Sequence, residues 1–440
     1  MNAVIIAVLI MLVLSLARVH VVIALVLGAL AGGLIGGLGL TETIDVFTNG
    51  LGGSANVALS YALLGGFAIA ISRTGLPDVI VKMAIAVVGR EGDSRKKALS
   101  KALIFILILT ISCFSQNVVP IHIAFIPILI PPILKILNEL AVDRRAIAAI
   151  ITFGLTAPYI LLPYGFGAIY HDILEANIAE SGLVINRSDI PTALLLPVAG
   201  LLIGLFVAVF ITYRKQRNYE TKELMTSETS VDKNYTKRSI VFAIIAILVT
   251  LVVQIVTKSM IISALAGLVV IYLSGTIKWK ESDELVTNGM KMMAFIGFVM
   301  LSASGFAAVI RETGHVDLLV EQVAGVIGQN QGLAALLMLL VGLFITMGIG
   351  SSFSTIPIIA AIFVPLGVAV GFSPLAIIAL IGTAGALGDA GAPASDSTLG
   401  PTAGLNADGQ HDHIWDTCVP TFIHFNIPLL ILGWVAAMIL

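Results

Sequence analysis

The residues best suited to bind a cation lie in a short polar run near the carboxyl end of an otherwise apolar chain. This run, GDAGAPASDSTLG at residues 388–400, brings Asp389 and Asp396 together with hydroxyl groups, glycines and a proline. Carboxylates at bilayer depth are costly, and irregular backbone persists there only where it is buried in protein or lines a wet cavity. The run is therefore typical of an ion or substrate site within a membrane. The alternative is that both carboxylates cap helix ends by accepting hydrogen bonds from backbone amides.

Three other apolar segments carry similar interruptions. They are SCFSQNVVP (112–120), TAPYILLPYGFG (156–167) and GIGSSFSTIP (348–357). Proline removes a backbone donor and glycine permits an unwound turn, so freed carbonyls and nearby hydroxyls can coordinate a cation. The N-terminus of a half-helix can hold an anionic group such as a carboxylate. The alternative for these hydroxyls and amides is hydrogen bonding between helices.

We expect two sets of side chains to line the site. The ion-binding set offers the oxygen ligands that a dehydrated Na+ accepts: Ser115, Asn117, Ser352, Ser354, Thr355, Asp389, Ser395 and Asp396. The substrate-binding set is Gln116, Thr156, Tyr159, Tyr164, Ser397, Thr398, His424 and Asn426. His411 and His413 are expected in a solvated loop, because no further ligand cluster supports a metal site. No cofactor is expected beyond the transported or coupling Na+ or H+.

Composition identifies the elements that must position these residues. Of 440 residues, 58% are apolar and only 11% are charged, whereas average usage of charged residues is about 25%. Apolar runs of membrane-spanning length recur along the whole chain, which predicts a polytopic integral membrane protein. Nucleic-acid binding has no support, because the basic residues lie in loops between apolar runs.

The chain contains an internal duplication. Residues 41–89 and 280–328 align without a gap, and the same spacing continues upstream. Matched pairs include Gly28 with Gly267, Gly50 with Gly289, Gly66 with Gly305 and Phe67 with Phe306. Internal repeats of this kind are the usual construction of secondary transporters.

The charges of the connecting segments predict that the second copy is inverted. Residues 73–101 are rich in Lys and Arg, which favours the cytoplasmic side, whereas the equivalent residues 312–340 contain neither. Residues 278–291 also read as cytoplasmic. We therefore expect a first transmembrane repeat at 1–213, a basic cytoplasmic linker at 214–238 and a second, inverted repeat at 239–440.

The apolar runs predict roughly ten to fourteen crossings, because some segments could be re-entrant hairpins. Amphipathic segments are expected at 76–89 and 315–328. The expected apolar segments are 2–17, 20–39, 55–72, 101–118, 120–137, 145–166, 190–213, 239–257, 259–277, 290–310, 332–350, 353–371, 373–391 and 414–440.

A family resemblance rests on three runs. GALGDAGAPASDSTLGPTAGLNADGQHDHIWDTCVPTFIHFNIPL (385–429), SCFSQNVVPIHIAFIPILIPP (112–132) and MGIGSSFSTIP (347–357) resemble the NhaC-like Na+/H+ antiporter family, and most closely its bacterial histidine permease branch. The resemblance implies the ion transporter superfamily fold: an all-α polytopic membrane protein with two inverted-topology repeats, re-entrant hairpins and broken helices. It also implies a multi-pass protein of the bacterial inner (plasma) membrane. By this likeness, 115–117 and 352–355 belong to the hairpins, and 156–164 and 388–398 to the broken helices.

These observations predict a secondary active transporter that takes up an amino acid, with histidine favoured, coupled to Na+ or H+. The alternative is a Na+/H+ antiporter without an organic substrate. A membrane-embedded enzyme or receptor is disfavoured, because the loops are short and no nucleotide or nucleophile motif is present. The expected partners are a small-molecule substrate, a coupling cation and the lipid bilayer, and the chain could form a homodimer. A cation bound through charge is expected at Asp389 or Asp396.

Overall fold

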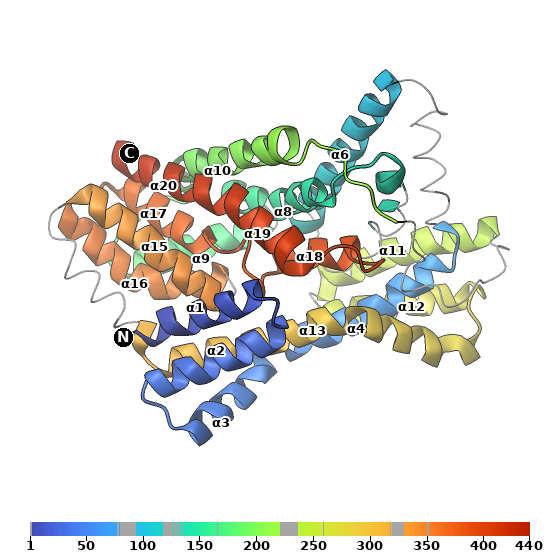
Figure 1. Ribbon diagram of the computed structural model, residues 1–440, viewed down its shortest axis with the longest axis horizontal. Helices are drawn as coiled ribbons and strands as arrows, with labels where there is room; N and C mark the ends of the chain where they lie inside the picture. The colour runs from blue at the N-terminus through green and yellow to red at the C-terminus, as the bar shows by residue number, and fades with distance from the viewer. Residues whose placement is uncertain are drawn as a thin grey trace.

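The computed structural model describes residues 2–76, 79, 94–117, 126, 130, 133–134, 136–164, 166–220, 236–257, 259–316, 318, 330–349 and 352–440. Within these ranges every regular element is a helix, as the apolar runs predict (Figure 1). Most of the predicted segments 76–89, 120–137 and 315–328, and linker residues 221–235, lie outside them.

The helices of the two halves follow one another in the same order. The first half consists of α1 (Ala3–Leu16), α2 (Val21–Ile35), α3 (Leu40–Gly50), η1 (Leu51–Ser54), α4 (Ala55–Ser72), α6 (Ser94–Asn117), α8 (Arg144–Leu161), α9 (Phe166–Glu180), α10 (Asp189–Val207) and η2 (Ala208–Thr212). The second consists of α11 (Lys237–Thr257), α12 (Met260–Leu273), η3 (Trp279–Glu281), α13 (Ser282–Glu312), α15 (Gln331–Ile349), α16 (Ser352–Val370), α17 (Pro374–Ala386), α18 (Asp396–Leu405), η4 (His413–Cys418), α19 (Val419–Thr421), η5 (Phe422–Asn426) and α20 (Ile427–Ile439).

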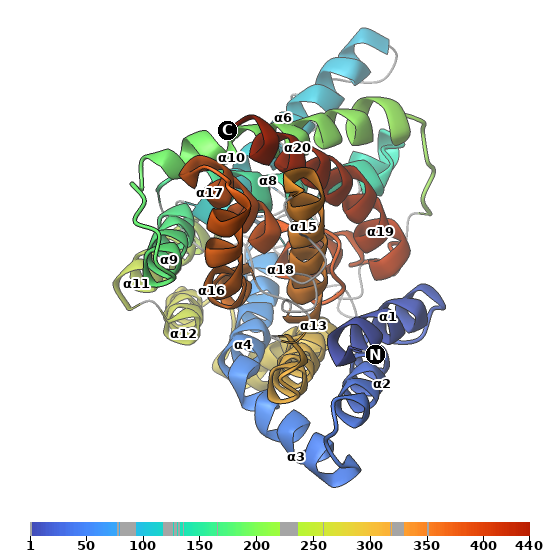
Figure 2. The same ribbon diagram turned by 90° about the vertical axis from the view of Figure 1, so that its left-hand side faces the viewer.

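These helices form two parts. The scaffold layer contains the early helices of each half, α1–α4 and α11–α13, and the core bundle contains the later ones, α6–α10 and α15–α20. Figures 1 and 2 show the scaffold layer along one side of the molecule and the core bundle on the other. Both predicted broken helices lie in the core bundle.

Contacts between the halves are reciprocal within the scaffold layer. A side chain at Gly28 would meet the ring of Phe306, and one at Gly267 would meet the ring of Phe67. These residues are the pairs matched by the sequence duplication, so each half places the same glycine against the other half's phenylalanine. The close approaches at Gly50 and Gly289 repeat this pattern, because Gly50 faces Gly305 and Gly289 faces Gly66.

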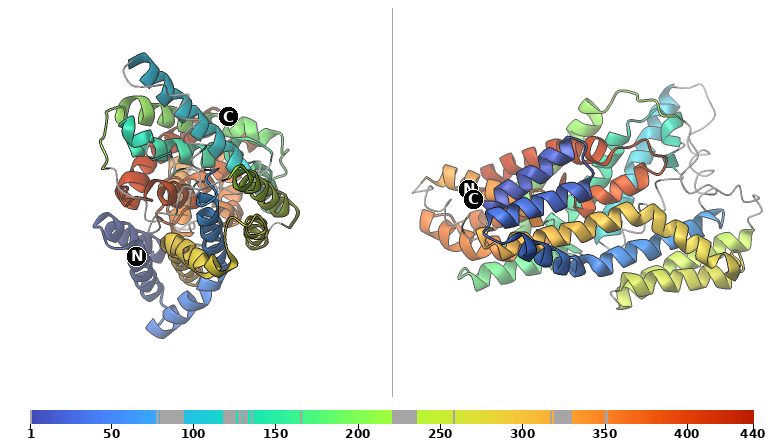
Figure 3. Two further views of the ribbon diagram at one scale, coloured as in Figure 1. Left: turned by 90° about the vertical axis from the view of Figure 1, so that its right-hand side faces the viewer. Right: turned by 60° about the horizontal axis from the view of Figure 1, so that its bottom comes forward.

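The equivalent helices run in opposite directions. Along the contact, residue numbers rise from Gly50 to Gly66 on one side while they fall from Gly305 to Gly289 on the other. The right-hand view of Figure 3 shows α13 running alongside α3 and α4. An antiparallel pair of equivalent helices with reciprocal contacts is what an inverted repeat produces. The predicted all-α polytopic fold is confirmed.

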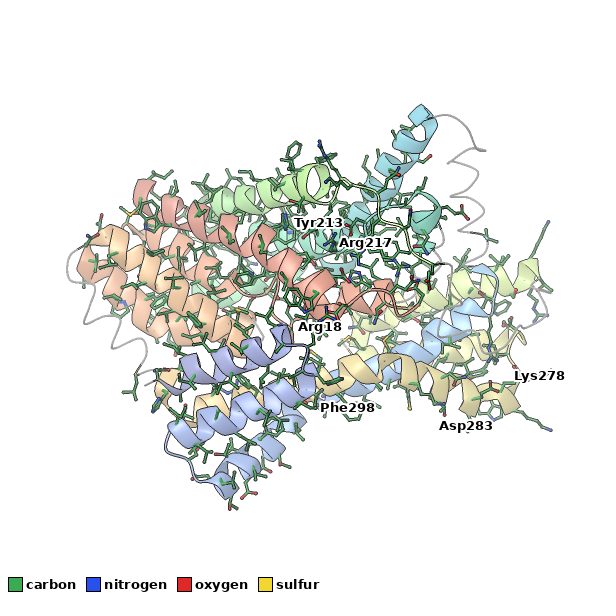
Figure 4. All side chains as sticks on the ribbon, in the orientation of Figure 1. Arg18, Tyr213, Arg217, Lys278, Asp283 and Phe298 are labelled. Atoms are coloured by element: carbon green, nitrogen blue, oxygen red, sulfur yellow. The ribbon has the colours of Figure 1, made fainter. Side chains whose placement is uncertain are left out.

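Charged residues at the ends of scaffold-layer helices lie together at one end of the molecule. Arg73 forms ion pairs with Glu281 at 3.3 Å and with Glu284 at 3.7 Å. Figure 4 places Lys278 and Asp283 at this same end. Residues 73 and 278–284 were both predicted to face the cytoplasm, and the structure puts them on a common side.

Five helices among the described residues are long and apolar enough to cross a membrane: Arg144–Leu161, Asp189–Thr212, Lys237–Thr257, Gln331–Gly348 and His413–Ile439. The bent pair Leu40–Gly53 and Ala58–Ile71 raises this number to six. Several other predicted spans form shorter apolar helices. Pro374–Ala386, for example, is short because the polar run that follows ends the helix.

Candidate ion and substrate site

Both predicted broken helices are broken where proline and glycine occur. In the first half α8 ends at Leu161 and α9 begins at Phe166, and in the second half α17 ends at Ala386 and α18 begins at Asp396. We call residues 387–395 the second break. Gly388 and Gly391 have φ angles of +91° and +102°, which lie in the left-handed region that favours glycine. The helix therefore unwinds here because of the local residues, the two glycines.

Side chains from other helices satisfy the backbone of the second break. Asn426 Oδ1 accepts a hydrogen bond from the amide of Gly388 at 2.8 Å, and Asn426 Nδ2 donates to the carbonyl of Ala390. Thr398 Oγ1 donates to the carbonyl of Ala392 at 2.6 Å. Buried polar groups must find partners, so these contacts hold the irregular segment in a single conformation.

The carboxylate of Asp389 is the centre of the candidate site. It accepts hydrogen bonds from the hydroxyl groups of Tyr159 at 2.8 Å, Ser395 at 2.6 Å and Ser397 at 3.0 Å. The Tyr159 hydroxyl also lies 3.1 Å from Ser352 Oγ. We call these five residues the Asp389 cluster. Tyr159 comes from α8 in the first half, whereas the other four belong to the second, so the cluster lies between the halves.

The Asp389 cluster has the chemistry of a site for a hard monovalent cation. All its polar atoms are oxygens, the ligand type that hard cations prefer. A hydroxyl group carries two lone pairs as well as one proton, so it can rotate from donating toward the carboxylate to coordinating a cation. The Tyr159 side chain is only 2% exposed, and the low polarity around it strengthens electrostatic attraction to a cation.

The remaining predicted residues of the second half lie in different settings. Asp396 is in the first turn of α18 and is partly exposed, which fits the capping alternative as well as an ion-binding role. Thr355 is buried on α16. His424 contacts Thr212 at 2.9 Å and the carbonyl of Pro420 at 2.7 Å, rather than any member of the cluster. The side chain of Ser354 lies outside the described residues.

Among the predicted residues of the first half, only Tyr159 contacts the cluster directly within the described residues. Thr156 Oγ1 donates to the carbonyl of Thr152 in its own helix. Tyr164 lies between α8 and α9 and is 75% exposed. The side chains of Ser115, Gln116 and Asn117 fall outside the described residues.

The prediction of a solvated loop around His411 and His413 is wrong. Their exposed fractions are 2% and 7%, and both rings accept or donate hydrogen bonds to buried groups. The loop folds back onto α18 and is buried there. Its polar composition did not indicate this burial, because burial here depends on tertiary packing. Threonines at 402 and 417 within apolar surroundings are the signal that could have pointed to partners for these rings.

A buried ion pair at the start of α8 was also missed. Arg144 is fully buried and binds Asp408 through both guanidinium nitrogens, at 2.6 and 2.5 Å. It donates further to the carbonyl of Leu405 at 2.9 Å. This pair ties the beginning of α8 to the end of α18, the two helices that adjoin the breaks in opposite halves.

The comparisons with known proteins cover most of the chain. Profiles described as "Na+/H+ antiporter family" and "Na+-H+ antiporter family" match residues 150–434 and 2–88. A putative amino acid transporter, YuiF of Bacillus subtilis, is 62% identical over the full length of both chains. An uncharacterized membrane protein of Vibrio parahaemolyticus, VP2115, is 55% identical over the full length of both.

Among solved structures, Neisseria gonorrhoeae MtrF, described as an antimetabolite efflux pump, aligns with a TM-score of 0.42 at 17% identity, covering 91% of this chain and 85% of its own. The sequence relatives and the apolar helices make the protein a multi-pass transporter of the bacterial plasma membrane, and not an enzyme. The chain belongs to the Na+/H+ antiporter family.

Proposed function

We propose that the protein is a secondary active transporter that imports an amino acid, with histidine favoured, by coupling uptake to Na+ or H+. The observation that carries the proposal is the buried Asp389 cluster, which joins a carboxylate to hydroxyl groups of both halves. In this proposal residues 1–213 and 239–440 are inverted repeats joined by a cytoplasmic linker at 214–238. They alternate access to the cluster by moving against each other.

The coupling cation binds at Asp389 in this proposal. Ser352, Ser395 and the Tyr159 hydroxyl supply neutral oxygens, and the other predicted ion ligands complete the set: Ser115, Asn117, Ser354, Thr355 and Asp396. One carboxylate with neutral oxygens matches a single positive charge, so binding leaves little net charge to desolvate. The cation can then move with the site through the low-polarity interior.

The two half-helix N-termini suggest how an amino acid is oriented. The first turn of α9 carries no acidic residue, so its positive end suits the substrate carboxylate. The first turn of α18 carries Asp396, which suits the ammonium group instead. The substrate-binding set is then Gln116, Thr156, Tyr159, Tyr164, Ser397, Thr398, His424 and Asn426. The amino-acid assignment is supported by the YuiF relative, which is described as a putative amino acid transporter.

Uptake by proteoliposomes tests the function. Labelled histidine should accumulate when an inward Na+ or H+ gradient is imposed, and the Asp389→Asn variant should lose the gradient-driven accumulation. A panel of amino acids, with Na+ and H+ varied separately, identifies the substrate and the coupling ion. If no amino acid accumulates under any gradient, the importer assignment is wrong.

The second candidate is a Na+/H+ antiporter that moves no organic solute. It is favoured by the family description and by the presence of a single carboxylate in the cluster, which could exchange a cation for a proton. In the same proteoliposomes, a Na+ gradient alone would then change the luminal pH. Asp389→Asn should abolish that change.

A further inference from the structure

A short turn between α12 and α13 exposes a tryptophan between two lysines. Lys278, Trp279 and Lys280 are all exposed, and 77% of the Trp279 side chain is accessible. Within the same turn, Ile277 is buried and Gly275 has a φ of +74°, which glycine adopts readily. We call residues 274–281 the Trp279 turn.

Neighbouring side chains hold the indole ring of Trp279 in place. The ring of Tyr272 packs against it edge to face, with the ring centres 5.3 Å apart. The Tyr272 hydroxyl in turn donates to Ser282 Oγ at 2.7 Å. At the start of the turn, Ser274 Oγ donates to Thr276 Oγ1 at 2.6 Å. The exposed indole is therefore carried by an ordered turn with its own hydrogen bonds.

The two lysines of the Trp279 turn are available to an external anion. Within the described ranges, neither Lys278 nor Lys280 forms an ion pair. The nearest carboxylate in sequence, Glu281, pairs with Arg73 at 3.3 Å, and Glu284 lies 3.7 Å from the same guanidinium. Both glutamates thus interact with Arg73 rather than with the lysines.

The end of the scaffold layer around the turn is positively charged. Ser239 Oγ donates to the carbonyl of Thr74 at 2.8 Å, so the start of α11 lies beside the end of α4. This contact brings two further basic residues to the same end, where Figure 4 shows Lys278 and Asp283. Among the described residues there, the basic side chains outnumber the acidic ones. The basic residues are Arg73, Lys237, Arg238, Lys278 and Lys280, and the acidic residues are Glu281, Asp283 and Glu284.

The internal duplication provides a second copy of this turn with different side chains. In the alignment of the two halves, residues 39–41 (GLT) take the place of residues 278–280 (KWK). Both turns contain a glycine with a left-handed φ, Gly37 at +88° and Gly275 at +74°. The backbone turn is therefore common to both halves, whereas the tryptophan and the lysines occur in the second half alone.

The two turns lie at opposite ends of α13. The Trp279 turn immediately precedes this helix, whereas a side chain at Gly36 would meet Thr313, which immediately follows it. The 31 residues of α13 make it about 45 Å long, and the hydrocarbon core of a bilayer is about 30 Å thick. The turns therefore belong to opposite membrane surfaces, and the basic residues put the Trp279 turn at the cytoplasmic one.

We propose that the Trp279 turn binds the head groups of anionic phospholipids in the cytoplasmic leaflet. Tryptophan favours the membrane interface, where its ring is partly in contact with lipid and its N–H with water. Leu273, the last residue of α12, is 71% exposed and faces the acyl chains below the head groups. The ammonium groups of Lys278 and Lys280 then attract the lipid phosphates. This inference rests on the inverted topology that is part of the proposed function.

The lipid contact stabilises the position of the scaffold layer rather than that of the cation site. Glu281 belongs to the turn and pairs with Arg73 at the end of α4, so the contact reaches scaffold helices of both halves. The members of the Asp389 cluster belong to the core bundle. Substitutions in the turn should therefore change lipid preference without changing the cation dependence of uptake.

Quenching by brominated lipids tests the proposal. The chain has three tryptophans, and the difference between wild type and Trp279→Phe isolates the signal of Trp279. In nanodiscs of phosphatidylcholine, brominated phosphatidylglycerol should quench this signal more strongly than an equal fraction of brominated phosphatidylcholine. Lys278→Gln and Lys280→Gln should each lower this preference by about fivefold, because a basic residue at an anionic surface contributes about 1 kcal/mol.

Two control variants show whether the preference belongs to the turn. Lys215→Gln removes an exposed lysine of the linker and should leave the signal of Trp279 unchanged. Leu40→Trp, made together with Trp279→Phe, places the reporter at the equivalent position of the first half. Leu40 is 55% exposed and has no lysine beside it, so both brominated lipids should quench that reporter equally.

Three outcomes would overturn the proposal. They are equal quenching of Trp279 by the two lipids, an unchanged preference in the Lys278→Gln and Lys280→Gln double variant, and the same preference at position 40. If histidine accumulates in proteoliposomes but Trp279 shows no lipid preference, the lipid contact is wrong and the importer stands. If the preference is present but no amino acid accumulates, the importer is wrong and the lipid contact stands.

Discussion

At the scale of single residues, Tyr159 connects the two halves of the chain at the candidate site through one hydroxyl group. That hydroxyl donates to Asp389 at 2.8 Å and contacts Ser352 at 3.1 Å. We expect Tyr159→Phe to weaken the apparent cation affinity by about tenfold to a hundredfold, because a hydrogen bond to a charged group contributes about 1.5–3 kcal/mol. The cation dependence of uptake measures this change.

Tyr170→Phe is the matched control for that substitution. Tyr170 is also fully buried and packs against Tyr159, but its hydroxyl donates to the carbonyl of Gly382 rather than to the carboxylate. It should alter thermal stability more than cation affinity. Equal losses of cation affinity in both variants would remove Tyr159 from the site.

The buried Arg144–Asp408 pair leads to a stability prediction. Asp408→Ala leaves a fully buried guanidinium uncompensated, which costs about 3–5 kcal/mol, so the Tm in detergent should fall by many degrees. The exposed ion pair between Asp172 and Arg187 is the control, because surface pairs contribute about 0–1 kcal/mol. If Asp172→Ala lowers the Tm as much as Asp408→Ala, burial does not determine the effect.

Sequence alone made Asp389 a candidate because a carboxylate in an apolar run has few structural explanations. It could not distinguish the surroundings of Asp389 from those of Asp396, since both lie in one polar run and only the folded break turns Asp389 toward Tyr159 and Ser397. It misjudged His413 because burial of a polar loop depends on tertiary packing, here the contact of His413 with Thr402 and Pro393. Arg144 and Asp408 are far apart in sequence, so no local pattern pairs them.

At the scale of elements, the second break depends on glycine. Gly391 has a φ of +102°, and a side chain there would come within 2.6 Å of the Cβ atom of Phe422. Gly391→Ala therefore adds both backbone strain and a clash, each costing about 1–3 kcal/mol. Thermal unfolding in detergent should show a clear fall in Tm.

Gly52 supplies the matched control for Gly391. Nothing lies within 4 Å of a side chain placed at Gly52, and its φ is not in the left-handed region. Gly52→Ala should leave the Tm within about a degree or raise it slightly, because alanine reduces the entropy of the unfolded chain. A Tm for Gly391→Ala equal to that of Gly52→Ala would show that the second break tolerates a side chain.

The positions of both breaks were predictable because proline and glycine act locally. Pro163 lies between α8 and α9, and Pro393 lies between α17 and α18. The lengths of the flanking helices were less predictable. Pro374–Ala386 ends before the apolar sequence does, because Leu387 is extended and Gly388 is left-handed.

At the scale of the whole molecule, the reciprocal contacts give the duplication a geometric meaning. Gly28 packs on Phe306 and Gly267 packs on Phe67, so a single two-fold relation accounts for both. The sequence alignment matched Gly28 with Gly267 and Phe67 with Phe306. It could not reveal that each glycine contacts the phenylalanine of the other half. Two copies related in this way present the same surface to opposite sides of a membrane, as alternating access requires.

Single cysteines at positions 96 and 330 test that inversion directly. Position 96 lies in the basic segment after the first scaffold helices, and position 330 lies in the equivalent segment of the second half, which lacks Lys and Arg. In inside-out and right-side-out vesicles, a membrane-impermeant maleimide should label the two positions from opposite sides. The background is the unmodified protein, whose own cysteines are the buried Cys418 and the half-buried Cys113. Labelling of both positions from one side would mean that the two halves have the same orientation in the membrane. That result would contradict the inverted repeat, in which α13 and α4 cross the membrane in opposite directions.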